Sequence, residues 1–208
     1  MEVRWLGRKP YAEVWALQKQ LVEAIAAGDT PDTLLLVEHD PIFTLGRKAG
    51  AAGNVLDAGD IPVLQVERGG DVTYHGPGQL VGYPLVALRD GERDLHRYLR
   101  NLEAWLIAVL ADYGLEAERN EGLTGVWARG KKLASLGVAV RKWVTYHGFA
   151  LNVDPDLSHF ARLNPCGLQS SVMASLASEL GRAPAMDEVV ERVLAHAPMA
   201  LGRQAVCV

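Results

Sequence analysis

Apolar residues recur at helical spacing in several parts of the chain. In residues 11–27 they fall three or four positions apart, and a glycine follows as a C-terminal stop. Residues 94–113 carry the strongest such stripe, with Asp94 as a candidate N-cap. Residues 171–180 and 187–195 show the same periodicity over shorter lengths. We therefore expect helices over these four ranges.

Short apolar runs bounded by turn residues predict strands between the helices. The predicted strands cover residues 3–6, 34–37, 42–45, 80–86, 115–118, 126–127, 133–140 and 147–152. The run at 3–6 is expected at a sheet edge, and residues 202–208 are either a frayed end or a closing edge. Strands and helices do not alternate regularly. The pattern therefore predicts one α+β domain over residues 1–208, with a mixed, largely antiparallel sheet flanked by helices.

Residues 47–59 are rich in Gly, Ala and Asn and are expected to form a loop. That loop is either a plain connection or a flap over a site.

Composition narrows the class of protein. The chain has 208 residues, of which 49% are hydrophobic, and a net charge of −4, which disfavours non-specific nucleic-acid binding. No apolar run approaches a membrane span, and the N-terminal residues lack the apolar segment of a signal peptide. Two cysteines do not make a disulfide framework. We expect a cytoplasmic protein in a reducing compartment.

Candidate chemistry gathers in residues 130–167. Cys166 stands between a proline and a glycine, where a turn could present its sulfur to a cavity. Lys132 opens an apolar run containing small residues, and a lysine drawn into a pocket of low dielectric can act as a base. Together they suggest a nucleophile and its base.

A second informative stretch, residues 68–84, packs four glycines around Thr73, Tyr74 and His75. A phosphate cradle is one interpretation, but the spacing matches neither of the common glycine-rich fingerprints. A plain hairpin with tight turns is another. The third is a backbone wall along which a narrow ligand lies, with close approaches that only glycine permits. His75 by itself is more typical of a hydrogen-bonded structural histidine.

The order of these motifs resembles the lipoyl(octanoyl) transferases. The resemblance rests on residues 68–81, 132–137, 147–152 and 165–167, with residues 38–46 similar to an upstream motif of that family. It implies the fold shared with the catalytic domains of biotin and lipoate ligases. It also implies transfer of an octanoyl group from octanoyl-acyl carrier protein to a lysine of a lipoyl domain. The acceptors implied are the lipoyl domains of 2-oxo acid dehydrogenases and the glycine cleavage H protein.

The resemblance also implies roles for individual residues. Cys166 would carry the acyl group as a thioester, and Lys132 would lower the pKa of its thiol. The implied substrate-binding residues are Arg68, Gly69, Gly70, Asp71, Val72, Thr73, Tyr74, His75, Ser135, Leu136, Gly137, Gly148, Phe149 and Ala150. Many family members have a threonine where this chain has Ala174, so a hydroxyl role at that position is in doubt.

The chemistry of acyl transfer agrees with this assignment. A thiolate exchanges readily with an acyl thioester, and a desolvated lysine can then take a proton from the attacking amine. No cluster of His, Cys and Asp has metal-ligand spacing, so neither a metal nor another cofactor is expected. Two alternatives stay open: an ATP-dependent lipoate or biotin ligase of the same fold, and a non-catalytic module that binds acyl groups or their carrier.

Overall fold

An eight-stranded sheet runs through the computed structural model, which describes residues 1–164, 172–204 and 206–207. In spatial order its strands are β11 (Val206–Cys207), β1 (Glu2–Lys9), β2 (Thr33–His39), β6 (Gln79–Leu85), β10 (Val144–Asn152), β9 (Lys131–Arg141), β8 (Leu123–Ala128) and β7 (Ala117–Asn120). The strands β11, β1 and β2 are parallel, and each later neighbouring pair is antiparallel. The predicted α+β class with a largely antiparallel sheet is confirmed.

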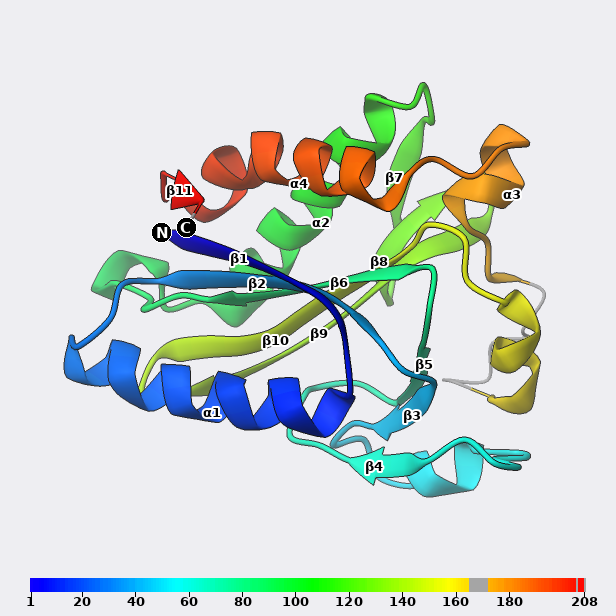
Figure 1. Cartoon of the computed structure of the whole chain (residues 1–208), viewed down its shortest axis with the longest axis horizontal. Coiled ribbons are helices and arrows are strands. Elements are labelled where there is room, and N and C mark those ends of the chain that lie inside the picture. The colour runs from blue at the N-terminus through cyan, green and yellow to red at the C-terminus, as the bar shows by residue number, and fades with distance from the viewer. Residues whose placement is uncertain (165–171, 205, 208) are drawn as a thin grey trace.

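A three-stranded sheet lies beside the large one (Figure 1). It consists of β4 (Val63–Gln65), β3 (Ile42–Leu45) and β5 (Val72–His75). The helices are α1 (Tyr11–Ala27), α2 (Leu95–Ala111), α3 (Leu176–Leu180) and α4 (Met186–Leu201), with short 3₁₀ turns η1 (Ala51–Asn54), η2 (Asp90–Glu92) and η3 (Leu157–Arg162). Figure 1 shows α1 on one face of the large sheet and α2 with α4 on the other.

Each face of the large sheet has its own apolar core. On one face α1 buries Val14, Leu21 and Ile25 against β2, β6 and β10. On the other, α2 and α4 pack around Trp105, whose indole nitrogen donates to the carbonyl of Val193 at 2.8 Å. Fully burying a side chain of this kind contributes about 1.5–3 kcal/mol, so these two layers carry most of the apolar stabilisation.

The two long predicted helices are confirmed, and their ends follow from local sequence. Helix α1 covers residues 11–27 and ends at Gly28, whose φ of 83° lies in the left-handed region that glycine tolerates. The side chain of Asp94 caps α2 by accepting a hydrogen bond from the amide of Arg97 at 3.0 Å.

Several predicted boundaries were wrong, including that of the strand expected over 115–118, which lies at Ala117–Asn120. The helix expected over 171–180 begins only at Leu176, because the preceding backbone at Ala174 is hydrogen-bonded to β9 and Ser175 caps the helix. Helix α4 continues beyond 195 to Leu201, since its buried face extends past Pro198. The first strand does not end the sheet, because residues 206–207 pair with it as the closing edge.

Within the residues that the structure describes, no helix is both long and apolar enough to cross a membrane.

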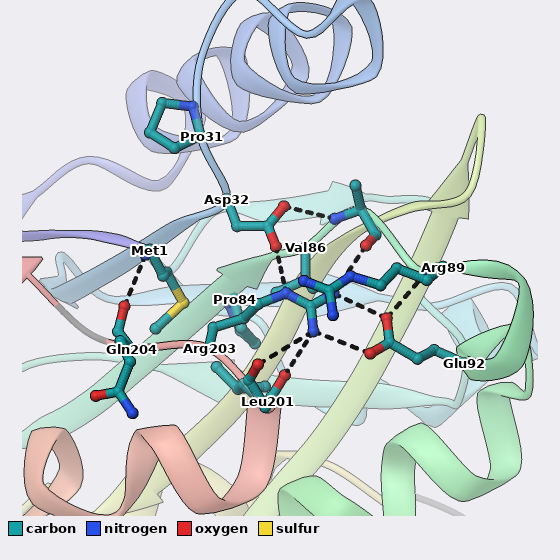
Figure 2. A network of polar contacts seen from close by, with 12 residues as sticks. Met1, Pro31, Asp32, Pro84, Val86, Arg89, Glu92, Leu201, Arg203 and Gln204 are labelled. Carbon is teal, nitrogen blue, oxygen red and sulfur yellow. Dashed lines mark hydrogen bonds and ion pairs between the residues drawn. The ribbon is translucent and has the colours of Figure 1, made fainter.

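A polar network around Arg203 joins the end of the chain to its beginning (Figure 2). The guanidinium is only 8% exposed; its Nε lies 2.7 Å from a carboxylate oxygen of Asp32, and its two terminal nitrogens lie 2.9 and 2.8 Å from the carboxylate of Glu92. The second oxygen of Asp32 accepts from the amide of Ala87 at 2.8 Å. Hydrogen bonding to Arg203 lowers the pKa of Glu92 to about 2. Three distant segments therefore meet at one buried cation.

We predict that Arg203→Met lowers the free energy of unfolding by roughly 2–4 kcal/mol at pH 7, because it leaves two carboxylates without their cation. The folded-state pKa of Glu92 lies below its ordinary value of 4.5, so this stabilisation is present above pH 4.5 and is lost as the pH falls towards 2. The difference between wild type and variant in urea unfolding should shrink over that window.

Arg8→Met is the matched control, because Arg8 and Asp40 form an ion pair whose side chains are 54% and 49% exposed. It should cost less than about 1 kcal/mol. Equal losses in the two variants, or a difference at Arg203 that does not change with pH, would contradict a stabilising role for the buried network.

Candidate functional site

A cavity of about 220 Å³ lies between the large sheet and the β5 end of the small one. Its wall includes most of the residues that the sequence motifs singled out. Those are Lys132, Arg68, Gly70, Asp71, Val72, Thr73, His75, Ser135, Leu136, Gly137, Gly148, Phe149 and Ala150. Gly69 and Tyr74 do not line it, and Tyr74 instead packs against Phe43 and Phe160 in the core of the small sheet. The substrate-binding role of these residues stays a prediction.

The sheet register brings two distant motifs side by side. In the antiparallel pair β9–β10, Ser135 lies opposite Ala150 and Gly137 lies opposite Gly148. The amide of Gly69 donates to the carbonyl of Val138 at 2.9 Å, so the loop before β5 crosses over β9 at this point. A Cβ at Gly137 would lie 3.0 Å from the carbonyl oxygen of Gly69, which explains the need for glycine there.

Lys132 stands at the start of β9 and at one end of the cavity. Its Nζ donates to the carbonyl of Thr124 at 2.9 Å and lies 5.7 Å from the ring centroid of Trp127. A Cβ at Gly125, whose φ is 146°, would fall 2.5 Å from Cε of Lys132. A side chain at position 125 would therefore displace the lysine.

Cys166 lies outside the described residues, so no distance joins it to Lys132. The described chain on either side of 165–171 is nevertheless anchored near the cavity. Before it, the amide of Asn164 donates to the carbonyl of Asn54 at 2.8 Å. After it, Met173 forms a parallel bridge with Lys132, and the amide of Ala174 donates to the Lys132 carbonyl at 3.0 Å.

Ala174 makes its contacts through the backbone. Its carbonyl accepts from the side chain of Asn152 at 2.9 Å, and its side chain is 1% exposed. The threonine found in many family members would add a hydroxyl at a buried position whose backbone groups are already bonded.

A buried carboxylate ties the loop over residues 47–59 to the cavity. Both oxygens of Asp71 lie 2.9 Å from the amide nitrogen of the Asn54 side chain, and Lys48 lies 3.0 Å away. One Asp71 oxygen also accepts from the amide of Val72 at 2.8 Å. Asn54 in turn holds Asn164, so the same contacts fix the chain that leads towards Cys166. This loop contains the turn η1 and is more than a plain connection.

The histidines near the cavity are kept neutral. Burial lowers the pKa of His39 and of His147 to about 4, and it lowers that of His75 well below its ordinary value. His75 is hydrogen-bonded to Gln79 through Nδ1 at 2.8 Å, and Gln79 donates to Asn152 at 2.9 Å. His75 thus has the contacts of a structural histidine while forming part of the wall.

Sequence reasoning missed several lining residues. They are Tyr11, Val81, Tyr83, residues 122–124, His147, Phe160 and Met173. His147 lay inside a quoted motif but was not singled out. Tyr11 opens a helix whose stripe indicated only core packing, so no local signal marked it.

The arrangement fits a narrow apolar chain with a reactive head group. The apolar part of the wall includes Val81 and Ala150, which belong to the core on the α1 face, and Lys132 is the lysine among the described lining residues. Among the described residues, no group of three or more His, Cys, Asp or Glu side chains could hold a metal ion.

Octanoyltransferases from other organisms are similar to this sequence over nearly its whole length. An octanoyltransferase of Syntrophotalea carbinolica is 56% identical over 196 residues, covering 94% of this chain and 92% of its own. An octanoyltransferase of Geobacter metallireducens is 51% identical, covering 97% and 93%. The family described as the lipoyl protein ligase A/B catalytic domain matches residues 10–197.

Solved structures confirm the fold. A bipartite lipoate protein ligase from Thermoplasma acidophilum superposes with a TM-score of 0.76 at 20% identity, covering all of this chain and 88% of that one. A biotin protein ligase from Aquifex aeolicus, in complex with biotin and ATP, gives 0.61 at 14% identity, with 97% and 70% covered. At such identities the likeness concerns the fold alone. The family match and the named relatives decide the assignment: this chain belongs to the lipoyl protein ligase A/B catalytic-domain family and, within it, to the lipoyl(octanoyl) transferases.

Proposed function

We propose that this acyltransferase moves an octanoyl group from octanoyl-acyl carrier protein to a lysine of a lipoyl domain, through a thioester on Cys166. The observation that carries the proposal is the position of Lys132. It stands at the end of an apolar cavity, and its backbone holds Met173 and Ala174, the residues that follow the cysteine segment. The lipoyl domains of 2-oxo acid dehydrogenases and the glycine cleavage H protein are the proposed acceptors.

Chain connectivity supports a short distance between Cys166 and the cavity. Cys166 is two residues beyond Asn164, and a chain of two residues spans at most about 7 Å. Asn164 is bonded to Asn54, which binds Asp71 in the cavity wall. These contacts hold Asn164, the last described residue before Cys166, beside the cavity wall.

The proposed reaction has two half-reactions that balance without a cofactor. In the first, the Cys166 thiolate attacks the octanoyl carbonyl, the bond between that carbonyl and the carrier's sulfur breaks, and the carrier leaves as its thiol after taking a proton from the Lys132 ammonium. In the second, the neutral amine of the acceptor lysine attacks the enzyme thioester, an amide forms, and the Cys166 thiolate leaves. Lys132 stabilises the thiolate as an ammonium and, as a neutral amine, accepts the proton released by the acceptor.

The two alternative functions, an ATP-dependent ligase and a non-catalytic binding module, differ from a transferase in that neither requires Cys166. An ATP-dependent ligase activates a free acid with a nucleotide and has no need of Cys166. A module that only binds acyl groups or carriers would leave Cys166 without a catalytic role. The relatives at 50% identity or more are named octanoyltransferases, whereas the lipoate and biotin ligases resemble this chain at 20% identity or less, which favours the transferase.

We also propose a docking surface for the acyl carrier protein, which we expect to be an acidic partner. Three basic pairs in the sequence are candidates for docking it: Arg47 with Lys48, Arg129 with Lys131, and Arg141 with Lys142. The last pair lies nine residues along β9 from Lys132, about 30 Å away, and both of its members bind Glu23 at 2.8 Å. Lys48 holds Asp71. Arg129 and Lys131 lie just before Lys132 and are exposed, although Arg129 also lies 3.4 Å from a carboxylate oxygen of Glu179. We propose them as the docking pair because they are the basic pair nearest to Lys132 in the sequence.

We predict that Cys166→Ala abolishes transfer and that Lys132→Met lowers kcat/KM by at least about a hundredfold, because the variant loses both the thiolate's cation and the base. Lys132→Arg keeps a charge but does not deprotonate, so its Cys166 should still react with iodoacetamide near neutral pH while transfer fails. Alkylation rate against pH, with transfer assayed in parallel, separates the two roles of the lysine.

Lys142→Met is the matched control for this series, since it makes the same substitution in the turn that follows the far end of β9. It should leave both profiles unchanged. If wild type and Lys132→Met give superimposable alkylation profiles, Lys132 does not activate Cys166. Nucleotide-dependent octanoylation that survives Cys166→Ala would favour the ligase instead.

For docking, we predict that reversing both charges at Arg129 and Lys131 raises KM for octanoyl-acyl carrier protein by roughly tenfold and weakens its dependence on salt. The rate at saturating donor should change less. The same double reversal at Arg141 and Lys142 should leave KM unchanged. An unaltered KM in the Arg129 and Lys131 variant would remove this pair from the docking surface.

A further inference from the structure

The end of the cavity remote from Lys132 is polar. Val138 is six positions after Lys132 along β9 and lies opposite His147 in the register. His147 lines the cavity there with Tyr11 and Arg68. We refer to Tyr11, Arg68 and His147 as the polar end. The cavity thus changes from a lysine at one end, through apolar walls, to buried polar groups at the other.

Hydrogen bonds from its terminal nitrogens hold the guanidinium of Arg68 in place, whereas its third nitrogen, Nε, makes none among the described residues. Arg68 is 8% exposed, and its terminal nitrogens donate to the carbonyl and hydroxyl of Thr44 at 2.7 and 3.0 Å and to the carbonyl of Gly69 at 3.1 Å. Its Nε is buried without a hydrogen-bond partner among the described residues. An unsatisfied buried donor of this kind is rare and favours a polar atom or a water at the cavity surface.

His147 presents a second such nitrogen. The side chain is 1% exposed, and its Nε2 has no hydrogen-bond partner within the part of the chain that the structure describes. The hydroxyl of Tyr11 lies 3.4 Å from its Nδ1, and a carboxylate oxygen of Glu67 lies 3.6 Å from Nε2. Its backbone φ is 55°, and its amide donates to Gln18 of α1 at 2.8 Å. Helix α1 therefore fixes both the ring and the backbone at this end.

An alkyl chain gains little binding free energy by extending over buried donors that lack hydrogen-bond partners. Each methylene buried against apolar atoms contributes about 0.8 kcal/mol, but a methylene placed over an unsatisfied donor displaces water from it and leaves it unpaired. The gain per methylene therefore ends where the apolar wall ends. Resting on the proposed transferase function, we propose that the polar end is a stop that sets the upper length of the acyl group, so that chains longer than octanoyl are rejected.

Tyr11→Leu tests the stop, because it removes both the hydroxyl and the ring and leaves apolar surface and extra space. Wild type should transfer octanoyl faster than decanoyl from the corresponding acyl carrier proteins. The variant should raise the ratio of decanoyl to octanoyl kcat/KM by roughly fifteenfold, since two further methylenes can be buried at about fourfold each. Tyr11→Phe keeps the ring and should shift the ratio in the same direction by a smaller factor.

Tyr98→Leu is the matched control. Tyr98 is a buried tyrosine of α2 in the core on the opposite face of the sheet, and it does not line the cavity. It should leave the ratio as in wild type, even if it lowers stability. Thermal unfolding of all variants shows which are folded, and Tyr11→Phe carries the test if Tyr11→Leu does not fold.

The outcomes separate the stop from the function. If wild type transfers octanoyl but the ratio is the same in both Tyr11 variants and in Tyr98→Leu, the polar end does not select chain length, and the transferase function stands. A wild-type protein that transfers no acyl group of any length overturns the proposed function and the stop with it.

Discussion

The crossing of the residue 68–70 backbone over β9 at Gly137 is the contact on which the cavity depends. It is a single backbone hydrogen bond, from Gly69 to Val138 at 2.9 Å, made possible by the absence of a side chain at Gly137. This bond places the small sheet against the large one and closes a space between them. Arg68 and Asp71, on either side of the crossing, are then held by Thr44 and Asn54. The wall is therefore fixed mostly by backbone and buried polar contacts.

The same arrangement explains how apolar and reactive parts coexist in one site. The register of β9 and β10 supplies small and apolar surface in the middle of the cavity. Lys132 is held at one end by a carbonyl, and burial keeps the pKa of His147 near 4 at the other. Neutral histidines do not compete with the lysine for a thiolate.

Sequence patterns predicted the parts of the structure that depend on local signals. The amphipathic stripes of α1 and α2 have clear ends, at Gly28 and at Asp94, and both helices were located correctly. The helix predicted from 171 was placed too early, because hydrogen bonds to β9 hold the backbone at Ala174 and periodicity carries no trace of such tertiary contacts. Helix α4 was placed too short, because a proline in the last turn removes one donor while the apolar face continues.

The site was predicted from ordered motifs, and its geometry came from the fold. Nothing local in the sequence indicates that Tyr11, at the start of a helix, lies 3.4 Å from His147, which is 136 residues away. Tyr74 belongs to the motif yet packs in the core of the small sheet, whereas its neighbours Thr73 and His75 line the cavity, because alternate residues of a strand point to opposite sides. A motif therefore identifies a neighbourhood, and register decides which of its side chains line the cavity.

The most direct test of the account is the intact mass of the protein after incubation with octanoyl-acyl carrier protein, without an acceptor domain. The account predicts an increase of one octanoyl group, lost on adding hydroxylamine, absent in Cys166→Ala, and discharged when a lipoyl domain is added. Transfer of octanoyl to the lipoyl domain by a Cys166→Ala protein, with no acylated enzyme at any time, would contradict the thioester route.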